Sequence, residues 1–472
     1  MKTQLIWLIS FLIVAGKVNS QPLPQKLQSA VERLQADGQC RYASISLTVL
    51  DAKTGEQVYA VNPNMGLAPA STLKVITSVT AFNLLGKDFQ YQTQVGYSGT
   101  ISFDGTLTGD VIIKGSGDPT LGSWRYEKAK EAHILTQIVD ALQKAGVKKI
   151  NGRIIGDDSI FGSQSIPDGW IWQDVGNYYG AGTSGLCWRE NQYNIKLKTG
   201  AVGNPVLVFR EVPDMPYLTY KSELLNGASG TGDNSYAYLP AGGKLVYLRG
   251  TYAVDQYKKS ISVALPDAAF DAAFRLADTL NRIGLSVSNG PESSNTLTAK
   301  GLQTPQINSN LITLISPLLS QIIFWQNQKS INLYAEQVLK TLALKMGKEP
   351  TTANGVQVVQ DFWKARGIDP NSLNIADGSG LSPGDRVTTL TMATILQSAK
   401  KETWFPALYE SLPTHNGMKM KSGTINSVLN FAGYQTHNGR ELCFAVMVNN
   451  YSGTTSGIRE KIFRVLDELK AP

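Results

Sequence analysis

The sequence predicts an α+β fold in which the two ends of the chain share one sheet and a long, mainly β insertion separates them. A helix and a β-hairpin are expected near the N-terminus, and a strand pair followed by a helix near the C-terminus. Between about residues 88 and 300, short alternating segments separated by glycine-rich turns indicate many short strands. The 472 residues suffice for two or three domains with a substantial core.

The elements before the insertion follow from hydrophobic periodicity. Leu27, Val31 and Leu34 fall on one face of a helix expected over residues 25–36, and Gly38 ends it. Strands are expected at 45–49 and 57–61, and an apolar helix from 69 to 86.

Inside the insertion, one helix is expected over residues 268–283, and the pattern becomes helical again after about 303. The expected strands of the insertion are 93–97, 108–114, 195–198 and 245–249. The later elements are helices at 311–325, 333–346, 355–366 and 389–400, a hairpin of 419–425 and 429–448, and a closing helix around 458–469.

The first twenty residues have the pattern of a secretory signal peptide. Lys2 precedes an apolar run from Leu5 to Ala15, which is too short to cross a bilayer, and small residues precede an expected cleavage after Ser20. Cleavage would lower the formal net charge from +7 to +5, because Lys2 and Lys17 are removed. No other apolar run has membrane-spanning length, so we expect an exported, periplasmic or extracytoplasmic protein without an integral membrane segment after cleavage.

The composition disfavours several other functions. Basic residues are scattered rather than clustered, which argues against nucleic-acid binding. The three histidines form no zinc-protease pattern, and Cys40, Cys187 and Cys443 are too far apart for a metal knuckle. We therefore expect neither a metal site nor a cofactor.

Three short patterns together indicate serine acyl-transfer chemistry of the penicillin-binding kind: S-x-x-K, S-x-N and K-[ST]-G. Each pattern occurs more than once, and Ser, Lys and Gly are common residues, so a single match means little. The matches are Ser71/Lys74 and Ser398/Lys401; Ser293/Asn295, Ser330/Asn332 and Ser372/Asn374; and Lys53–Gly55, Lys198–Gly200 and Lys421–Gly423.

Context separates Ser71 and Lys74 from the other S-x-x-K match. They lie three positions apart at the start of an apolar helix, so their side chains share one face. Burial of that helix would desolvate the ammonium and lower its pKa, and a neutral lysine could take the proton of the serine hydroxyl. Ser398 and Lys401 follow a helix at a polar exit and are expected at the surface.

The other two patterns are best represented by Lys421–Thr424 and Ser330–Asn332. A strand at Lys421–Thr424 could pair with a peptide, present a cation to its carboxylate and offer an N–H to the oxyanion. Glycine at 423 would let the substrate backbone approach. Ser330–Asn332 precedes or opens a helix, where a simple helix cap is an equally good interpretation. Lys53–Gly55 is explained by a hairpin turn, and Lys198–Gly200 ends a strand inside the insertion.

These motifs and their order resemble the D-alanyl-D-alanine carboxypeptidase/endopeptidase family of class C low-molecular-mass penicillin-binding proteins. The resemblance covers nearly the whole chain after the expected signal peptide. It rests on Pro69–Lys74, Lys114–Pro119, Gly156–Phe161, Gly169–Trp170, Asp377–Ser382 and Lys421–Thr424. Lys74 and Ser330 are 256 positions apart, a spacing that matches the two inserted domains of that family, one nested within the other.

The resemblance implies a serine β-lactamase/transpeptidase-like catalytic domain, an antiparallel sheet with helices on both faces, formed by residues 21–87 and 303–472. It also implies an inserted domain II at 88–165 and 262–302, and a nested domain III at 166–261. The implied activity is that of a serine-type D-Ala-D-Ala carboxypeptidase and endopeptidase. Such an enzyme acts on peptidoglycan peptides and is acylated by penicillin and other β-lactams.

The resemblance further implies a role for each motif residue. Ser71 would be the acylated nucleophile and Lys74 its general base. Ser330 would pass a proton to the leaving group, Asn332 would orient the acyl amide, and Lys421 would stabilise charge. The substrate would contact Ser422, Gly423 and Thr424, the backbone N–H groups of Ser71 and Thr424 would form the oxyanion hole, and Asp157 would lie near the side chain of the wall peptide.

Two alternative functions remain open at this stage. A β-lactamase or esterase on the same scaffold is disfavoured by the large insertion and by S-x-N, and rapid penicillin turnover would favour it. An inactive peptidoglycan-binding module is disfavoured by the three intact motifs, and wall binding without D-alanine release would favour it.

Overall fold

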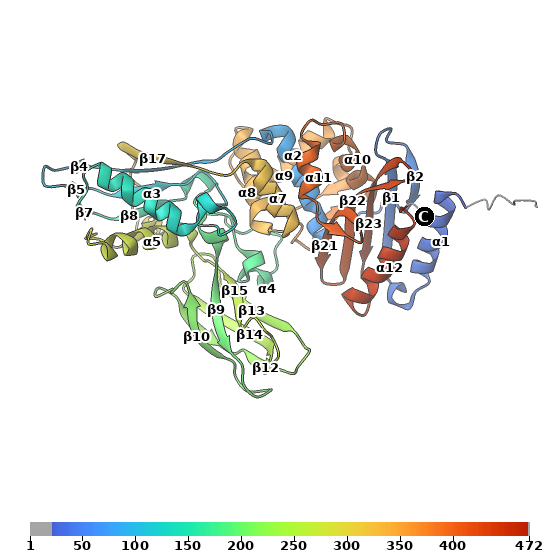
Figure 1. Cartoon of the computed structure of the whole chain (residues 1–472), viewed down its shortest axis with the longest axis horizontal. Helices are drawn as coiled ribbons and strands as arrows, with labels where there is room; N and C mark the ends of the chain where they lie inside the picture. Colours follow the sequence, from blue (N-terminus) through green and yellow to red (C-terminus); the bar gives the residue numbers. More distant parts are fainter. Residues whose placement is uncertain (1–20, 471–472) are drawn as a thin grey trace, which may run out of the picture.

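The computed structural model describes residues 21–470, so the expected signal peptide at 1–20 lies outside the described residues. The structure combines several β-sheets with helices, which confirms the α+β class. Figure 1 shows one helix-covered sheet toward one end of the molecule, the strands β4, β5, β7, β8 and β17 of the insertion toward the other, and the strands β9, β10 and β12–β15 projecting to the side.

Both ends of the chain contribute to one six-stranded antiparallel sheet, as the sequence predicts. Its strand order is β2-β1-β23-β22-β21-β20. β1 pairs with β23 along its whole length, from Ser44 opposite Asn449 to Asp51 opposite Leu442. The strands are β1 (Ser44–Asp51), β2 (Gln57–Val61), β20 (Thr414–His415), β21 (Met418–Ile425), β22 (Val428–His437) and β23 (Arg440–Asn449).

The expected single strand at 429–448 is wrong, because the chain reverses in its middle. Asn438 and Gly439 both have positive φ, 49° and 79°. This is the backbone that a two-residue hairpin turn requires, and Asn-Gly is a favoured pair for it. The segment therefore forms two strands, β22 and β23, instead of one.

Helices cover both faces of this sheet, and β23 shows how the two faces are divided. Phe444 and Val446 point into the hydrophobic cluster shared with α1 and α12, whereas Cys443 and Ala445 point into the cluster shared with α2 and α10. The helices are α1 (Leu23–Gln35), α2 (Leu73–Leu85), α7 (Leu319–Gln328), α8 (Asn332–Lys345), α9 (Thr352–Lys364), α10 (Thr389–Ala399), α11 (Phe405–Ser411) and α12 (Thr455–Asp467). A two-stranded sheet of β18 (Leu373–Asn374) and β19 (Arg386–Val387) lies between α9 and α10 in the sequence.

The insertion has sheets of its own. A five-stranded sheet has the order β16-β8-β6-β3-β17, a small sheet joins β4, β5 and β7, and two further sheets join β10-β9-β15 and β11-β14-β12 with β13. The first set of strands is β3 (Gln92–Tyr97), β4 (Thr100–Ile101), β5 (Thr106–Thr108), β6 (Val111–Lys114), β7 (Lys149–Asn151), β8 (Ile154–Asp157), β16 (Pro291–Ser293) and β17 (Ser309–Ile315). The second set is β9 (Gln192–Lys198), β10 (Leu207–Val212), β11 (Thr219–Ser222), β12 (Leu225–Gly227), β13 (Asp233–Tyr238), β14 (Leu245–Ala253) and β15 (Ser260–Ala264).

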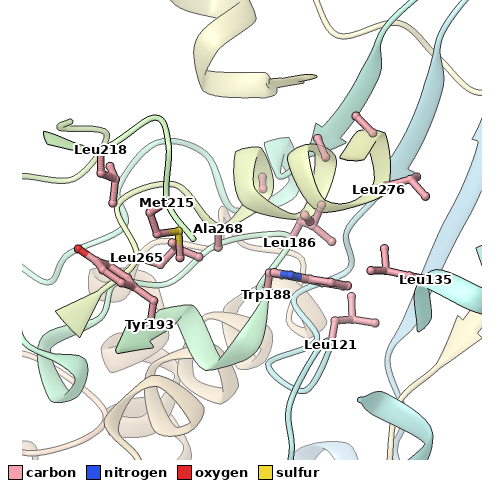
Figure 2. Close-up of a cluster of buried hydrophobic side chains, with 14 of the residues drawn as sticks. Leu121, Leu135, Leu186, Trp188, Tyr193, Met215, Leu218, Leu265, Ala268 and Leu276 are labelled. Carbon is pink, nitrogen blue, oxygen red and sulfur yellow. The ribbon is translucent and has the colours of Figure 1, made fainter. Parts of the chain in front are cut away.

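The insertion also has its own hydrophobic core, whose buried members run from Val95 to Leu314 and include no residue of the six-stranded sheet. Figure 2 shows part of it, with the Trp188 ring lying among Leu121, Leu135 and Leu186. The helices of the insertion are α3 (Glu131–Lys144), α4 (Trp172–Val175), α5 (Ala268–Arg282) and α6 (Ser294–Ala299).

Two expectations for this region are wrong. The sequence predicts one helix in the insertion, but α3 is a second long helix, which buries Ile134, Ile138 and Leu142 on one face. The helix expected over 311–325 begins only at α7, because Pro317 interrupts the run and the residues before it pair with β3 as β17.

We propose domain boundaries from these sheets and cores. β17 belongs to the sheet of the insertion, so a boundary near residue 316 suits the structure better than one at 303. The segment 166–261 contains β9 to β14 and lies between β8 and β16, which are paired neighbours in the five-stranded sheet. A nested third domain over that segment remains our proposal.

Candidate active site

Ser71 lies in a 3-10 turn, Ala70–Thr72, that leads directly into α2. Ala70 has a φ of 45°, a conformation that a non-glycine residue keeps only when its surroundings hold it. Two glycines from distant segments press on this turn. A Cβ atom on Gly380 would lie 1.9 Å from the Ala70 carbonyl oxygen, and one on Gly423 would lie 3.0 Å from the Ser71 nitrogen. The turn is therefore held between two backbones that approach too closely for side chains.

Lys74 lies one helical turn after Ser71 and is fully buried. Its Nζ contacts three acceptors: Ser71 Oγ at 3.0 Å, Asn332 Oδ1 at 2.6 Å and the Ser379 carbonyl oxygen at 2.7 Å. A neutral amine has two hydrogens and one lone pair. If Asn332 and Ser379 receive the two hydrogens, the lone pair is left for the hydroxyl proton of Ser71.

The charge state of Lys74 suits that task. Burial lowers the pKa of Lys74 to about 7, and the negative charges of Asp377, Glu336 and Asp385 oppose the shift. Burial also raises the pKa of the Glu336 carboxyl to about 8, and the charge of Asp377 adds to this effect. A lysine that is partly neutral near pH 7 can act as a general base.

Ser330 and Asn332 lie where α7 gives way to α8. Ser330 has a φ of 55°, and Asn332 is the first residue of α8. No side chain caps this helix start, so the helix-cap interpretation of the S-x-N pattern is wrong. Asn332 instead divides its amide between two partners, because Oδ1 accepts from Lys74 and Nδ2 donates to the Tyr179 carbonyl oxygen at 2.8 Å.

Lys421 brings the third motif to the same place. Its Nζ lies 3.0 Å from Ser330 Oγ and 2.7 Å from the Ser422 carbonyl oxygen. Burial lowers the pKa of Lys421 well below its usual range, and the nearby charge of Lys74 adds to the effect. A bound carboxylate would favour the charged form again.

The strand that carries Lys421 runs beside the nucleophile turn. β21 pairs with β22 on one side, while on the other side β20 pairs with Met418 and Lys419, and the Met420 N–H donates to the Pro413 carbonyl oxygen. From Lys421 onward, this edge of β21 has no strand partner among the described elements, so a peptide could pair with it. The structure gives a different reason for glycine at position 423 from the expected one. The missing side chain makes room for the turn that carries Ser71 rather than for substrate.

A cavity of about 1030 Å³ opens beside Ser71. Its walls come from both parts of the chain. Ser71, Ser330, Asn332, Thr424 and Asn426 line it from the catalytic part, and Ile171, Gln173, Asp174, Tyr178, Tyr179 and Tyr236 line it from the insertion. Of the expected contact residues on β21, only Thr424 lines this cavity; Ser422 is partly buried, Gly423 is buried, and neither lines it.

The structure does not bring Asp157 to this cavity. Asp157 is buried at the end of β8, where its Oδ1 accepts from the backbone N–H of Ser159 and the hydroxyl of Ser294, each at 3.0 Å. Its position near the side chain of a wall peptide therefore stays an expectation from resemblance alone.

The other motif matches lie outside the site. Ser398 Oγ donates to the Ile395 carbonyl oxygen of its own helix. Lys53–Gly55 forms the turn after β1, and Thr199 accepts from Lys259 within the insertion. Among residues 21–470, no group of three His, Cys, Asp or Glu side chains is placed to hold a metal ion.

Several residues that complete the site could not be recognised from a sequence motif. Ser379 and Tyr179 act through backbone carbonyls, which any residue could supply. Glu336 accepts the Gly378 N–H at 3.1 Å from the buried face of α8. Asp377 could have been singled out, because it opens the Asp-Gly-Ser-Gly segment used for the resemblance.

A serine hydroxyl beside a buried amine, with a second serine lining the same cavity and a second buried lysine bonded to it, is the site of a serine acyl-transfer enzyme. Comparison with known proteins agrees. The model of the D-Ala-D-Ala carboxypeptidase 3 (S13) family matches residues 27–469, so the chain belongs to this family of serine peptidases.

Relatives of the chain carry matching names. It is 24% identical over 455 residues to a D-alanyl-D-alanine carboxypeptidase of Actinomadura sp. strain R39, covering 91% of this chain and 82% of that one. It is 26% identical over 419 residues to the D-alanyl-D-alanine carboxypeptidase DacB of Haemophilus influenzae, covering 83% and 82%. The crystal structure of penicillin binding protein 4 from Haemophilus influenzae has the same fold, with a TM-score of 0.77, 23% identity, and coverage of 93% of this chain and 98% of that one.

Proposed function

We propose that the chain is an exported D-Ala-D-Ala carboxypeptidase/endopeptidase of peptidoglycan that works through an acyl-enzyme on Ser71. The observation that carries the proposal is the contact of Lys74 Nζ with Ser71 Oγ at 3.0 Å, with Asn332 and Ser379 as its other acceptors. The family already makes the chain a serine-type carboxypeptidase. The residue roles and the peptidoglycan substrate are the proposal.

In the first step, Ser71 Oγ attacks the carbonyl carbon of the penultimate D-alanine while Lys74 takes its proton. Negative charge develops on the carbonyl oxygen, where the backbone N–H groups of Ser71 and Thr424 stabilise it. The C–N bond then breaks, and the proton taken by Lys74 reaches the leaving amine through the Ser330 hydroxyl. Water hydrolyses the ester on Ser71 and regenerates the enzyme.

Lys421 and β21 bind the end of the peptide in this proposal. The substrate lies along the open edge of β21, and its terminal carboxylate lies near Lys421 and the hydroxyls of Ser422 and Thr424. The buried ammonium gains a counter-ion only when that carboxylate is present. β-Lactams acylate the same Ser71 hydroxyl because they offer it an activated amide in place of the peptide.

Export rests on the sequence pattern at residues 1–20. Within residues 21–470, every helix is too short or too polar to cross a membrane. A substrate in the cell wall requires a protein outside the cytoplasm, so the expected signal peptide and the proposed substrate agree.

The test is D-alanine release from a pentapeptide wall fragment, measured together with the opening of cross-linked dimers. Ser71→Ala should abolish both reactions. Ser398→Ala, which alters the other S-x-x-K match, should leave both unchanged. D-alanine release by Ser71→Ala at the wild-type rate would refute the assignment.

The same assay decides between the alternatives. Rapid and repeated turnover of penicillin, without D-alanine release, would mark a β-lactamase. Wall binding without either reaction would mark a binding module.

A further inference from the structure

The insertion reaches the catalytic part of the chain through Trp170. The indole Nε1 of Trp170 donates to Asp377 Oδ2 at 2.8 Å. Asp377 is fully buried and Trp170 is 7% exposed. A hydrogen bond to a carboxylate away from water is among the stronger ones in proteins.

Asp377 organises the loop that contacts Lys74. Its Oδ1 accepts the Gly380 N–H at 2.7 Å, and its Oδ2 accepts the Ser382 N–H at 2.8 Å in addition to the indole. The carboxylate thus fixes the course of residues 377–382. Within this loop, the Ser379 carbonyl oxygen accepts from Lys74 Nζ at 2.7 Å.

The same loop also presses on the nucleophile turn. Gly380 lies so close to Ala70 that a Cβ atom would meet the Ala70 carbonyl oxygen at 1.9 Å. A small shift of the loop would therefore move both the acceptor of Lys74 and the turn that carries Ser71. Shifts of about an ångström at such positions are costly for catalysis.

The inserted segment makes a second contact of this kind. The Tyr179 carbonyl oxygen accepts from Asn332 Nδ2 at 2.8 Å, which turns Asn332 Oδ1 toward Lys74. Two of the three acceptors of Lys74 are thus held by residues between 170 and 179. Trp170 itself does not line the cavity beside Ser71, although its neighbour Ile171 does.

We propose that Trp170 is a positioning residue for acyl transfer, which holds Asp377 so that the loop 377–382 keeps Lys74 directed at Ser71. The inserted domain is then a required part of the active centre, in addition to forming a wall of the cavity. This inference rests on the proposed roles of Ser71 and Lys74.

The test variant is Trp170→Phe, which keeps an aromatic ring and removes the N–H donor. The chain offers a matched control in Trp188→Phe. Trp188 is 1% exposed, and its indole nitrogen has no hydrogen-bond partner among the described residues. Figure 2 shows its ring among leucines of the inserted core. Both substitutions remove the same atoms from a buried site, and only one breaks a hydrogen bond.

The measurements are the acylation rate constant and the dissociation constant of the initial complex with a fluorescent penicillin, together with kcat and KM for D-alanine release. Trp170→Phe should lower the acylation rate constant and kcat about tenfold or more and leave the dissociation constant and KM within about twofold. Trp188→Phe should change none of the four by more than about twofold. Equal effects of the two variants, or a loss confined to KM, would overturn the proposal.

A double-mutant cycle with Asp377→Asn tests the route of the effect. Trp170→Phe should add less than about twofold to the loss caused by Asp377→Asn, because in this proposal Trp170 acts only through the Asp377 carboxylate. Fully multiplicative losses would overturn the proposal. If Trp170→Phe does not fold, the Asp377→Asn single variant carries the test, since wild-type acylation in that variant contradicts the role of the loop. Failure of the wild type to acylate on Ser71 would instead contradict the proposed function.

Discussion

The pH dependence of acylation follows directly from the position of Lys74. Only the neutral amine can take the Ser71 proton, and burial lowers the pKa of Lys74 to about 7. The perturbation is a change of pH from 5 to 9 on the wild-type protein. The charged and titratable groups that face the amine are Asp377, Glu336, Asp385 and Lys421.

The magnitude comes from the fraction of neutral Lys74. With a pKa of about 7, roughly half of the side chains are neutral at pH 7, about a tenth at pH 6 and about a hundredth at pH 5. The acylation rate constant should therefore rise about fiftyfold to a hundredfold between pH 5 and pH 8 and then level off. A lysine with an ordinary pKa would give no plateau below about pH 10.

The assay is stopped-flow acylation with a fluorescent penicillin at concentrations far below saturation. The rate constant is measured at half-unit steps of pH at constant ionic strength. A tenfold rise per pH unit that continues through pH 9 would refute the buried-lysine argument. A flat profile would show that Lys74 is not the base.

Three further substitutions test other parts of the site and the fold. Lys421→Ala should raise KM about tenfold or more for a peptide with a free terminal carboxylate and much less for the same peptide as its amide. The control Lys198→Ala, in another K-[ST]-G match, should change neither KM. Equal effects of Lys421→Ala on peptide and amide would contradict binding of the terminal carboxylate by Lys421. Gly423→Ala places a methyl group 2.5 Å from the Pro69 carbonyl oxygen, directly before the nucleophile turn, and should slow acylation more than tenfold. Gly200→Ala, where only one side-chain atom lies within 4 Å of the added methyl group, should not change the rate in the same stopped-flow assay. The N–H donors of the turn after β1 and the Arg440 guanidinium lower the pKa of Asp51 to about 2, so its carboxylate stabilises the fold above about pH 4 and loses this effect as the pH falls toward 2. Asp51→Ala should therefore lower the free energy of unfolding in urea by about 2 kcal/mol at pH 7 and by much less near pH 2. An equal loss at both pH values would contradict this reasoning.

Much of the fold could be predicted because the elements of the catalytic part have strong periodicity or clear ends. α1, α2 and α12 follow apolar faces, and the pairing of β1 with β23 follows from a hairpin at one end of the chain and strands at the other. β17 and α3 were harder to predict. β17 is a short apolar segment directly before helix α7, and only its pairing with β3 shows that it is a strand and not part of the helix.

The active site divides in the same way. Ser71, Lys74 and Lys421 could be predicted from motif spacing and from the elements that carry them, and the structure brings all three together with Ser330. The reason for Gly423 could not be predicted, because it depends on a turn more than 300 positions earlier in the sequence.

The backbone oxygens around Lys74 could not be predicted from the sequence. The Ser379 carbonyl oxygen accepts from Lys74 and the Tyr179 carbonyl oxygen accepts from Asn332, and both contacts depend on the path of the chain and not on the side chain. The contact of Trp170 could not be predicted either. A buried indole N–H usually donates to an acceptor, but the sequence does not show that this acceptor is the Asp377 carboxylate.

The site of the covalent bond to penicillin tests the central claim most directly. The protein is incubated with penicillin, digested, and the modified peptide is identified by mass spectrometry. The account predicts a single adduct on the peptide containing Ser71, located on that hydroxyl and absent from Ser71→Ala. An adduct on another residue, or one that persists in Ser71→Ala, would contradict it.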